Sequence, residues 1–127
     1  MRINGRAYRT IFLADEAGTV AVIDQTRLPF EFELRHLHRA TDAAVAIRDM
    51  VVRGAPLIGV TAAYGLALAM REDASDAMLR HAVHELAATR PTAVNLRWAL
   101  ARMESALREV PPSQRLARAY QAALRSH

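Results

Sequence analysis

The sequence contains no cysteine and no lysine, and aromatic residues make up only 6% of it. The absence of cysteine excludes disulfides, thiolate zinc sites and cysteine nucleophiles from this chain, and it favours a reducing, cytoplasmic location. All 17 basic residues are arginine, a choice that genome composition can produce and to which we give little functional weight. We expect no secretory signal, because residues 1–8 carry Arg2 and Arg6 without an apolar core.

The arginines are spread along the chain rather than massed in one block, and the formal net charge is +4. Spread charges of this kind are typical of solvated helix faces, so we expect no nucleic-acid partner, and a nucleic-acid groove is the less favoured alternative. A mild positive field still suits a small anionic substrate. The longest uncharged run, residues 54–70, is at the short limit for a bilayer span and contains Pro56, Gly59 and Gly65. We therefore expect a buried helix and no membrane partner.

The first forty residues have the pattern of strands. Two β-rich runs, residues 8–15 and 19–24, are joined by Glu-Ala-Gly, which places Gly18 in a hairpin turn. Residues 30–37 then alternate between apolar and charged side chains, as a half-buried strand does. We therefore predict a small three-stranded antiparallel sheet within residues 1–40.

The pattern changes at Thr41, where apolar residues begin to recur with the period of helices. We predict Thr41 as the N-cap of a first helix and Gly54 as its C-cap. Pro56 then starts a second helix, because a proline at the first helical position loses no hydrogen bond. This second helix is apolar almost all round, so we expect it to be the central one.

Three further helices complete a predicted bundle over residues 41–127, and the whole chain is of the α+β class. The third helix covers residues 76–88 with Ser75 as N-cap, and the fourth covers residues 93–109 with Thr92 as N-cap. The fifth follows the Pro-Pro-Ser segment. The side chains that we expect to face inward from it are Leu116, Tyr120, Ala123 and Leu124.

The Arg-Gly-Ala-Pro segment, residues 53–56, is the first candidate site. A helix that begins there presents free backbone N–H groups with a partial positive charge, and Gly54 lets a ligand approach the backbone closely. Arg53 adds a guanidinium fork suited to phosphate. Together these groups predict an anion site. From these four residues alone, an ordinary helix junction with a solvated arginine is the favoured alternative.

A second arginine, Arg90, precedes Pro91 and the predicted helix start, so it repeats the same arrangement or is simply solvated. The spacing of His81 and His84 fits a metal pair, but no third ligand has suitable spacing, so we predict a polar helix face and no metal site. Trp98 and Val94 lie four residues apart, which indicates a core or interface position rather than a stacking platform for bases.

Three segments resemble the N-terminal domain of the methylthioribose-1-phosphate isomerase family, which acts in methionine salvage. They are IRDMVVRGAPLIGVTAAYGLALA at residues 47–69, TRPTAVNLRWAL at residues 89–100, and the opening YRTIFLADEAGTVAVIDQTRLPFEFELRHL at residues 8–37. The resemblance covers essentially the whole chain. The same superfamily includes ribose-1,5-bisphosphate isomerases and the regulatory subunits of a translation-initiation guanine-exchange factor.

The resemblance implies an aldose–ketose isomerisation of methylthioribose 1-phosphate to methylthioribulose 1-phosphate. A phosphate on the anomeric carbon hinders ring opening, so the pocket must assist opening and then a hydrogen shift between adjacent carbons. By this resemblance Arg53, Gly54 and Ala55 match the family's substrate-binding triplet, and Arg90 matches a further substrate-contacting arginine. The resemblance thus reverses the preference for an ordinary junction. It implies a homodimer for the full-length enzyme, and no cofactor.

The family's catalytic cysteine and aspartate belong to a Rossmann-like C-terminal domain, and this sequence contains neither that domain nor any cysteine. No catalytic residue is therefore assigned in this chain. We expect an N-terminal portion of the isomerase, inactive alone, whether it is a truncated product, a fragment or a split subunit. The alternatives are a standalone regulatory or interaction module related to the exchange-factor subunits, a ribose-1,5-bisphosphate isomerase-like fragment, and a folded remnant without function.

Overall fold

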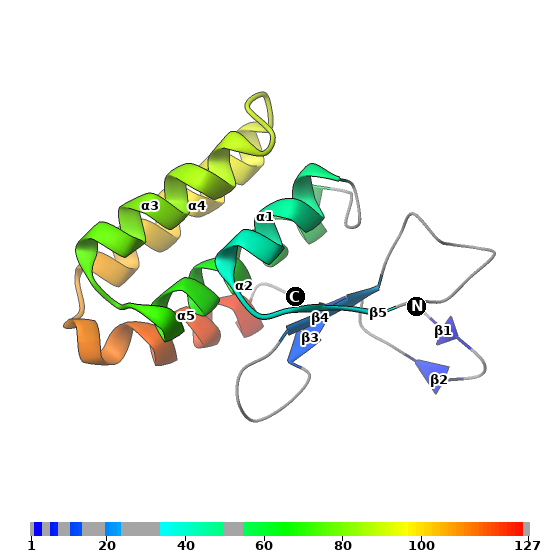
Figure 1. Cartoon of the computed structure of the whole chain (residues 1–127), viewed down its shortest axis with the longest axis horizontal. Coiled ribbons are helices and arrows are strands. Elements are labelled where there is room, and N and C mark those ends of the chain that lie inside the picture. Colours follow the sequence, from blue (N-terminus) through cyan, green and yellow to red (C-terminus); the bar gives the residue numbers. More distant parts are fainter. Residues whose placement is uncertain are drawn as a thin grey trace.

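The computed structural model describes residues 2–3, 6–7, 11–13, 20–23, 34–49 and 55–125. Within them, short strands come first and helices follow, so the predicted α+β class is confirmed (Figure 1). The strands are β1 (Arg2–Ile3), β2 (Arg6–Ala7), β3 (Ile11–Leu13), β4 (Val20–Ile23) and β5 (Leu34–Leu37). The helices are α1 (Ala40–Arg48), α2 (Ala55–Glu72), α3 (Asp76–Ala88), α4 (Val94–Arg108) and α5 (Pro112–Arg125). The division into regions at residue 40 stays a prediction.

The strands β3, β4 and β5 form the predicted antiparallel sheet, with β4 in the middle. Val20, Ala21 and Val22 of β4 are all fully buried. Because successive side chains of a strand point to opposite faces, both faces of β4 are covered. The sequence does not predict the separate pair β1–β2, because two-residue strands are too short to show alternation.

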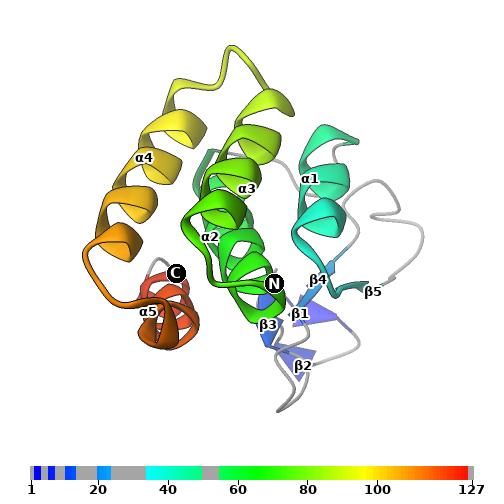
Figure 2. The ribbon, with the colours of Figure 1, turned by 60° about the vertical axis from the view of Figure 1, so that its left-hand side comes forward.

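The central position predicted for the second helix is confirmed, since α2 contacts each of the other four helices. Figure 2 shows α2 behind α3, with α1 and α4 on either side and α5 seen end-on. Every residue from 61 to 70 is buried. A helix enclosed on all sides needs apolar side chains all round, which explains its uniform composition.

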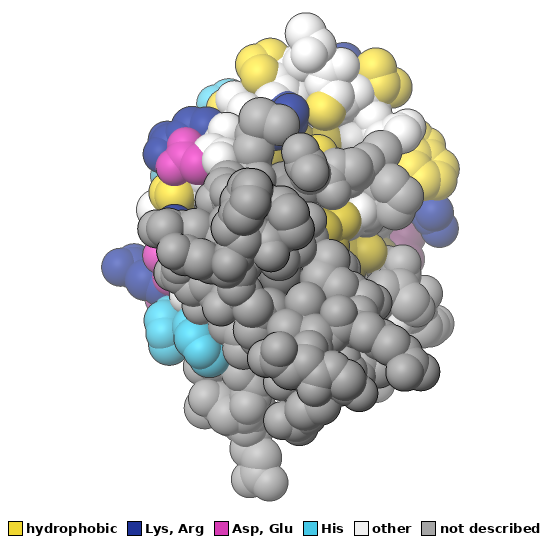
Figure 3. All heavy atoms as spheres, turned by 90° about the vertical axis from the view of Figure 1, so that its right-hand side faces the viewer, with side chains coloured by type: hydrophobic (Ala, Val, Ile, Leu, Met, Phe, Trp, Pro, Cys, Tyr) yellow, Lys and Arg dark blue, Asp and Glu magenta, His cyan; other side chains and the backbone are white. Residues whose placement is uncertain are grey.

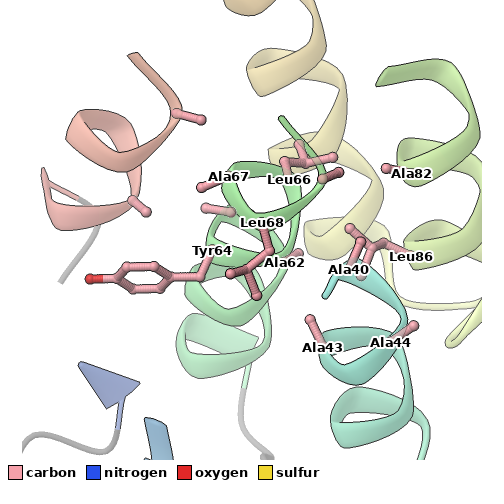
Figure 4. Close-up of a cluster of buried hydrophobic side chains, with 14 of the residues drawn as sticks. Ala40, Ala43, Ala44, Ala62, Tyr64, Leu66, Ala67, Leu68, Ala82 and Leu86 are labelled. Atoms are coloured by element: carbon pink, nitrogen blue, oxygen red, sulfur yellow. The ribbon is translucent and has the colours of Figure 1, made fainter. Parts of the chain in front are cut away.

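Small residues let α1 approach α2 closely. A Cβ atom added to Gly65 would lie 2.9 Å from the Cβ of Ala43, closer than real Cβ atoms approach one another. Figure 4 shows Ala43 and Ala44 of α1 beside the cluster of buried side chains from α2 and α3. The position of α1 therefore depends on the missing side chain at Gly65.

The start of α1 differs from the prediction. The N-cap is Arg39, and Thr41 lies inside the helix. The carboxylate of Asp42 accepts hydrogen bonds from the backbone N–H groups of His38 (3.0 Å) and Arg39 (3.1 Å), so the acidic residue in the first turn supplies the cap. At the other end α1 stops at Arg48, well before Gly54, which lies outside the described residues.

The predicted N-cap of α3 is confirmed, the predicted N-cap of α4 is wrong, and one residue of the predicted inward face of α5 is exposed. Ser75 caps α3, and its Oγ accepts a hydrogen bond from the N–H of Met78 at 3.2 Å. The N-cap of α4 is Ala93, which offers no side-chain acceptor, so the prediction of Thr92 is wrong. Leu124 of α5 is 45% exposed, so the prediction that it faces inward is wrong.

No helix in the described part of the chain is long and apolar enough to cross a membrane. Figure 3 views the molecule from the side that carries the strands. Among the described side chains on this face, the arginines (blue) stand at separate places, some beside acidic ones (magenta). That distribution agrees with the spread of arginines along the sequence.

Candidate anion-binding site

Four helix ends come together around Arg90, which lies in the turn between α3 and α4. The carbonyl of Ile47, near the end of α1, accepts a hydrogen bond from its Nε at 3.3 Å. Ile58, in the first turn of α2, lines the same pocket as Arg90. The end of α1 and the beginnings of α2 and α4 thus surround one guanidinium.

The guanidinium of Arg90 is only partly satisfied by the protein. Its Nη2 atom is buried and has no hydrogen-bond partner among the residues that the structure describes. A buried donor without an acceptor costs about 1–3 kcal/mol, and more when the group is charged. An arginine held by one edge, with a buried nitrogen left over, is what a site for an anionic ligand requires.

The N-terminus of α4 adds uncapped backbone donors to this site. Ala93 makes no side-chain cap, and the first N–H groups of a helix have no partner within the helix. These groups carry the positive end of the helix dipole, which favours anions. They border a pocket of about 350 Å³ lined by Ile58, Arg90, Thr92, Ala93, Val94, Asn95 and Leu96. A pocket of this volume suits a small phosphorylated metabolite.

Of the predicted site residues, the structure describes the backbone of Ala55 and all of Arg90. Ala55 is the first residue of α2, one helical turn, or about 5 Å along the axis, before Ile58. Arg53 and Gly54 lie outside the described residues. Ile47 and Ile58 flank them in sequence, and both contribute to the surroundings of Arg90.

The sequence predicts different roles for two other lining residues, Thr92 as a cap and Val94 as a core or interface position, and it does not mark Ile58 or Asn95 as site residues. Asn95 and Ile58 belong to the pocket, and Thr92 lines it instead of capping α4. The sequence signal that could have identified Thr92 and Asn95 is their position, two and five residues after Arg90. By contrast, His81 and His84 are exposed, and no group of three metal-ligating side chains exists among the described residues.

Comparison with known proteins gives the family. Residues 51–126, more than half of the chain, match the model of the initiation factor 2 subunit family. The chain belongs to this family. The matched region contains α2 to α5, and with them Arg90 and the pocket.

Within the family, the sequence is highly similar to curated isomerases. It is 67% identical over 120 residues to the methylthioribose-1-phosphate isomerase of Methylorubrum populi and 66% identical to that of Methylorubrum extorquens. Each match covers 94% of this chain and 33% of the relative, so the chain spans about a third of their length. The resemblance noted in the sequence is therefore confirmed.

Two solved structures share the fold. The 5-methylthioribose 1-phosphate isomerase of Pyrococcus horikoshii OT3 superposes with a TM-score of 0.84 at 34% identity, covering 95% of this chain and 36% of that one. The delta subunit of translation initiation factor eIF-2B from A. fulgidus gives a TM-score of 0.84 at 35% identity, covering 94% and 36%. Because the two scores are equal, the fold alone does not separate an isomerase from an initiation-factor subunit.

Proposed function

We propose that this chain is the N-terminal, substrate-binding part of an S-methyl-5-thioribose-1-phosphate isomerase, which converts methylthioribose 1-phosphate into methylthioribulose 1-phosphate in methionine salvage. The observation that carries the binding role is the buried Nη2 of Arg90, which lacks a partner in the described part of the chain. The identity of 67% over 120 residues to an isomerase supports this particular substrate. We further propose that the complete enzyme is a cytoplasmic homodimer.

In this proposal the chain binds the anion and positions the sugar. Arg90 donates to the phosphate, and the free N–H groups of α4 bind the same charge. We propose that Arg53, Gly54 and Ala55 also bind the substrate, as their match to the family's substrate-binding triplet implies. A hydrogen shift between adjacent carbons also needs an acid or base within hydrogen-bond reach of the substrate. We assign that group to the part of the isomerase that this chain does not span.

A titration of the purified chain tests the binding role. Half a pocket stays wet, so we expect weak binding of methylthioribose 1-phosphate, with a Kd on the order of 1 mM, and none of unphosphorylated methylthioribose. Arg90→Ala should weaken binding by about ten- to a hundredfold, because a charge-assisted hydrogen bond is lost. Arg97→Ala, on the exposed side of α4, is the matched control and should bind normally. Equal binding by both variants would remove Arg90 from the site.

An activity test separates the proposal from the regulatory alternative, which remains open because the fold is equally similar to the eIF-2B delta subunit. The chain alone should show no turnover. A hybrid in which this chain replaces the matching third of the Methylorubrum populi isomerase should isomerise the substrate, and Arg90→Ala should lower its kcat/KM. A hybrid that folds but neither binds nor isomerises the sugar phosphate would favour an interaction module.

A further inference from the structure

The outward face of α4 carries the two most exposed large hydrophobic side chains in the described part of the chain. Val94 is 66% exposed and Trp98 is 61% exposed. Because they are four residues apart, they lie one above the other on the helix surface. The guanidinium of Arg102 lies over the indole ring of Trp98, 4.8 Å from its centroid. Trp98, Ala101, Arg102, Ser105, Ala106 and Glu109 line a shallow hollow of about 470 Å³ on this face.

Single exposed apolar residues are normal on protein surfaces. This face differs because it is continuous with the anion pocket. Val94 is at once a wall of the pocket that holds Arg90 and the first residue of the exposed stripe. A partner that covers the Val94 side of the pocket therefore also reaches Trp98, which lies one helical turn, about 5 Å, further along α4.

We infer that the α4 face, defined as Val94, Trp98, Ala101 and Arg102, is the docking surface for the remaining two-thirds of the isomerase polypeptide. This inference rests on the proposed function. The curated relatives are about three times as long as the matched segment, so under the proposed function about two-thirds of the polypeptide is available to cover this face. The α4 face is where it can close the pocket and cover the exposed indole in one contact.

Net charge favours a partner other than a second copy of this chain. The exposed charged side chains of α4 and its C-cap are Arg97, Arg102, Arg108 and Glu109, so this surface is net positive. A symmetric dimer presents the same patch from both subunits, so it would bring these cations together. A partner surface with an apolar centre for Trp98 and carboxylates facing Arg102 fits better, since interface cores are apolar and opposite charges at the rim favour association.

Residue-specific hydroxyl-radical footprinting tests the inference on the chain alone and on the hybrid with the rest of the Methylorubrum populi isomerase. Trp98 is the only tryptophan of this chain, so its peptide identifies it without ambiguity. Its oxidation should slow at least fivefold in the hybrid. The exposed His84 of α3 should oxidise equally in both and serves as the internal reference. No substrate is present, so the result does not depend on the proposed function.

A variant gives the second measurement. Trp98→Ser should leave the Tm of the chain alone unchanged, because the side chain is exposed there, and should lower the Tm of the hybrid. Leu124→Ser on α5 is the control, and it should change the Tm of the chain alone and the Tm of the hybrid by the same amount. Equal oxidation of Trp98 in both proteins would overturn the inference. So would protection of Trp98 in the chain alone that disappears on dilution, since a second copy would then be the occupant.

Discussion

Two arginines mark opposite ends of the helical bundle, and only one of them has all its partners. Arg115 of α5 is 4% exposed, and its guanidinium reaches the carbonyl groups of Leu107 (2.9 Å), Val110 (3.3 Å) and Ala74 (2.8 Å). Its Nη2 also pairs with Asp76 at 2.7 Å. At the other end Arg90 has one hydrogen bond through Nε and a buried Nη2 with none in the described part of the chain.

The difference separates a structural arginine from a ligand-binding one. Arg115 donates to carbonyl groups at the end of α4 and before α3. It stabilises the junctions between helices, and each of its three nitrogen atoms has a partner in the described part of the chain. Arg90 is fixed against α1 by its Nε atom, and its Nη2 atom has no partner in the described part of the chain. The same residue type thus serves the fold at one end of the bundle and the proposed substrate at the other.

Replacing Arg115 should give the largest effect, and the effect should be on stability alone. Arg115→Met removes the hydrogen bonds from a buried guanidinium to the carbonyl groups of Leu107, Val110 and Ala74, which we expect to cost about 3 kcal/mol of unfolding free energy and roughly 10 °C in Tm. Arg118→Met, on the exposed face of the same helix, is the control and should change stability by less than about 0.5 kcal/mol. Thermal unfolding followed by circular dichroism measures both.

Binding completes the comparison of the two arginines. Under conditions where both variants are folded, Arg115→Met should bind methylthioribose 1-phosphate as the unmodified chain does, whereas Arg90→Ala should be stable and bind poorly. If Arg115→Met lost binding as well, the two ends of the bundle would not be independent, and the distinction between them would fail.

Adding one methyl group at Gly65 should disturb the Arg90 end through α1. Its Cβ would lie 2.9 Å from Ala43 and 3.2 Å from a methyl carbon of Leu86, so Gly65→Ala must push α1 away from α2 at a cost of about 1–3 kcal/mol. Because the Ile47 carbonyl of α1 holds Arg90, substrate binding should weaken too. Gly59→Ala is the control, since its Cβ would lie 3.9 Å from Ala99, an ordinary contact.

In that control, helix propensity should dominate. Gly59→Ala should raise stability by about 0.5–1 kcal/mol, because alanine is the better helix former. Opposite signs for the two substitutions, measured by chemical denaturation, would confirm that the contact at Gly65 sets the position of α1. Destabilisation by both would mean that the α2 glycines are needed for another reason.

Sequence patterns predicted the elements of this fold better than the partners of its polar side chains. The bounds of α3 and the cap at Ser75 followed from local rules that act within one turn. The burial of Arg115 did not, because its partners come from residues 74, 76, 107 and 110, which only the tertiary fold brings together. Arg90 was found by its place before a helix start, but its bond to Ile47, 43 residues away, has no local signal. The capping by Thr92 was wrong for a related reason, since local propensity does not show that the helix starts after Ala93.

The two caps provide the smallest and most closely matched prediction. Ser75 accepts from the Met78 N–H at the closed end of the bundle, so Ser75→Ala should cost about 1 kcal/mol. Thr92 is exposed, lines the Arg90 pocket and caps nothing, so Thr92→Ala should change stability by less than about 0.5 kcal/mol. The N-terminus of α3 is capped by Ser75 within the protein, whereas no side chain caps the N-terminus of α4.

A ligand titration of the two variants tests whether Thr92 contacts the substrate. If Thr92 only borders the anion, saturating methylthioribose 1-phosphate should raise the Tm of Ser75→Ala and of Thr92→Ala equally. A smaller shift for Thr92→Ala would instead show that its hydroxyl contacts the ligand, and equal loss of stability in both variants without ligand would show that α4 is capped after all.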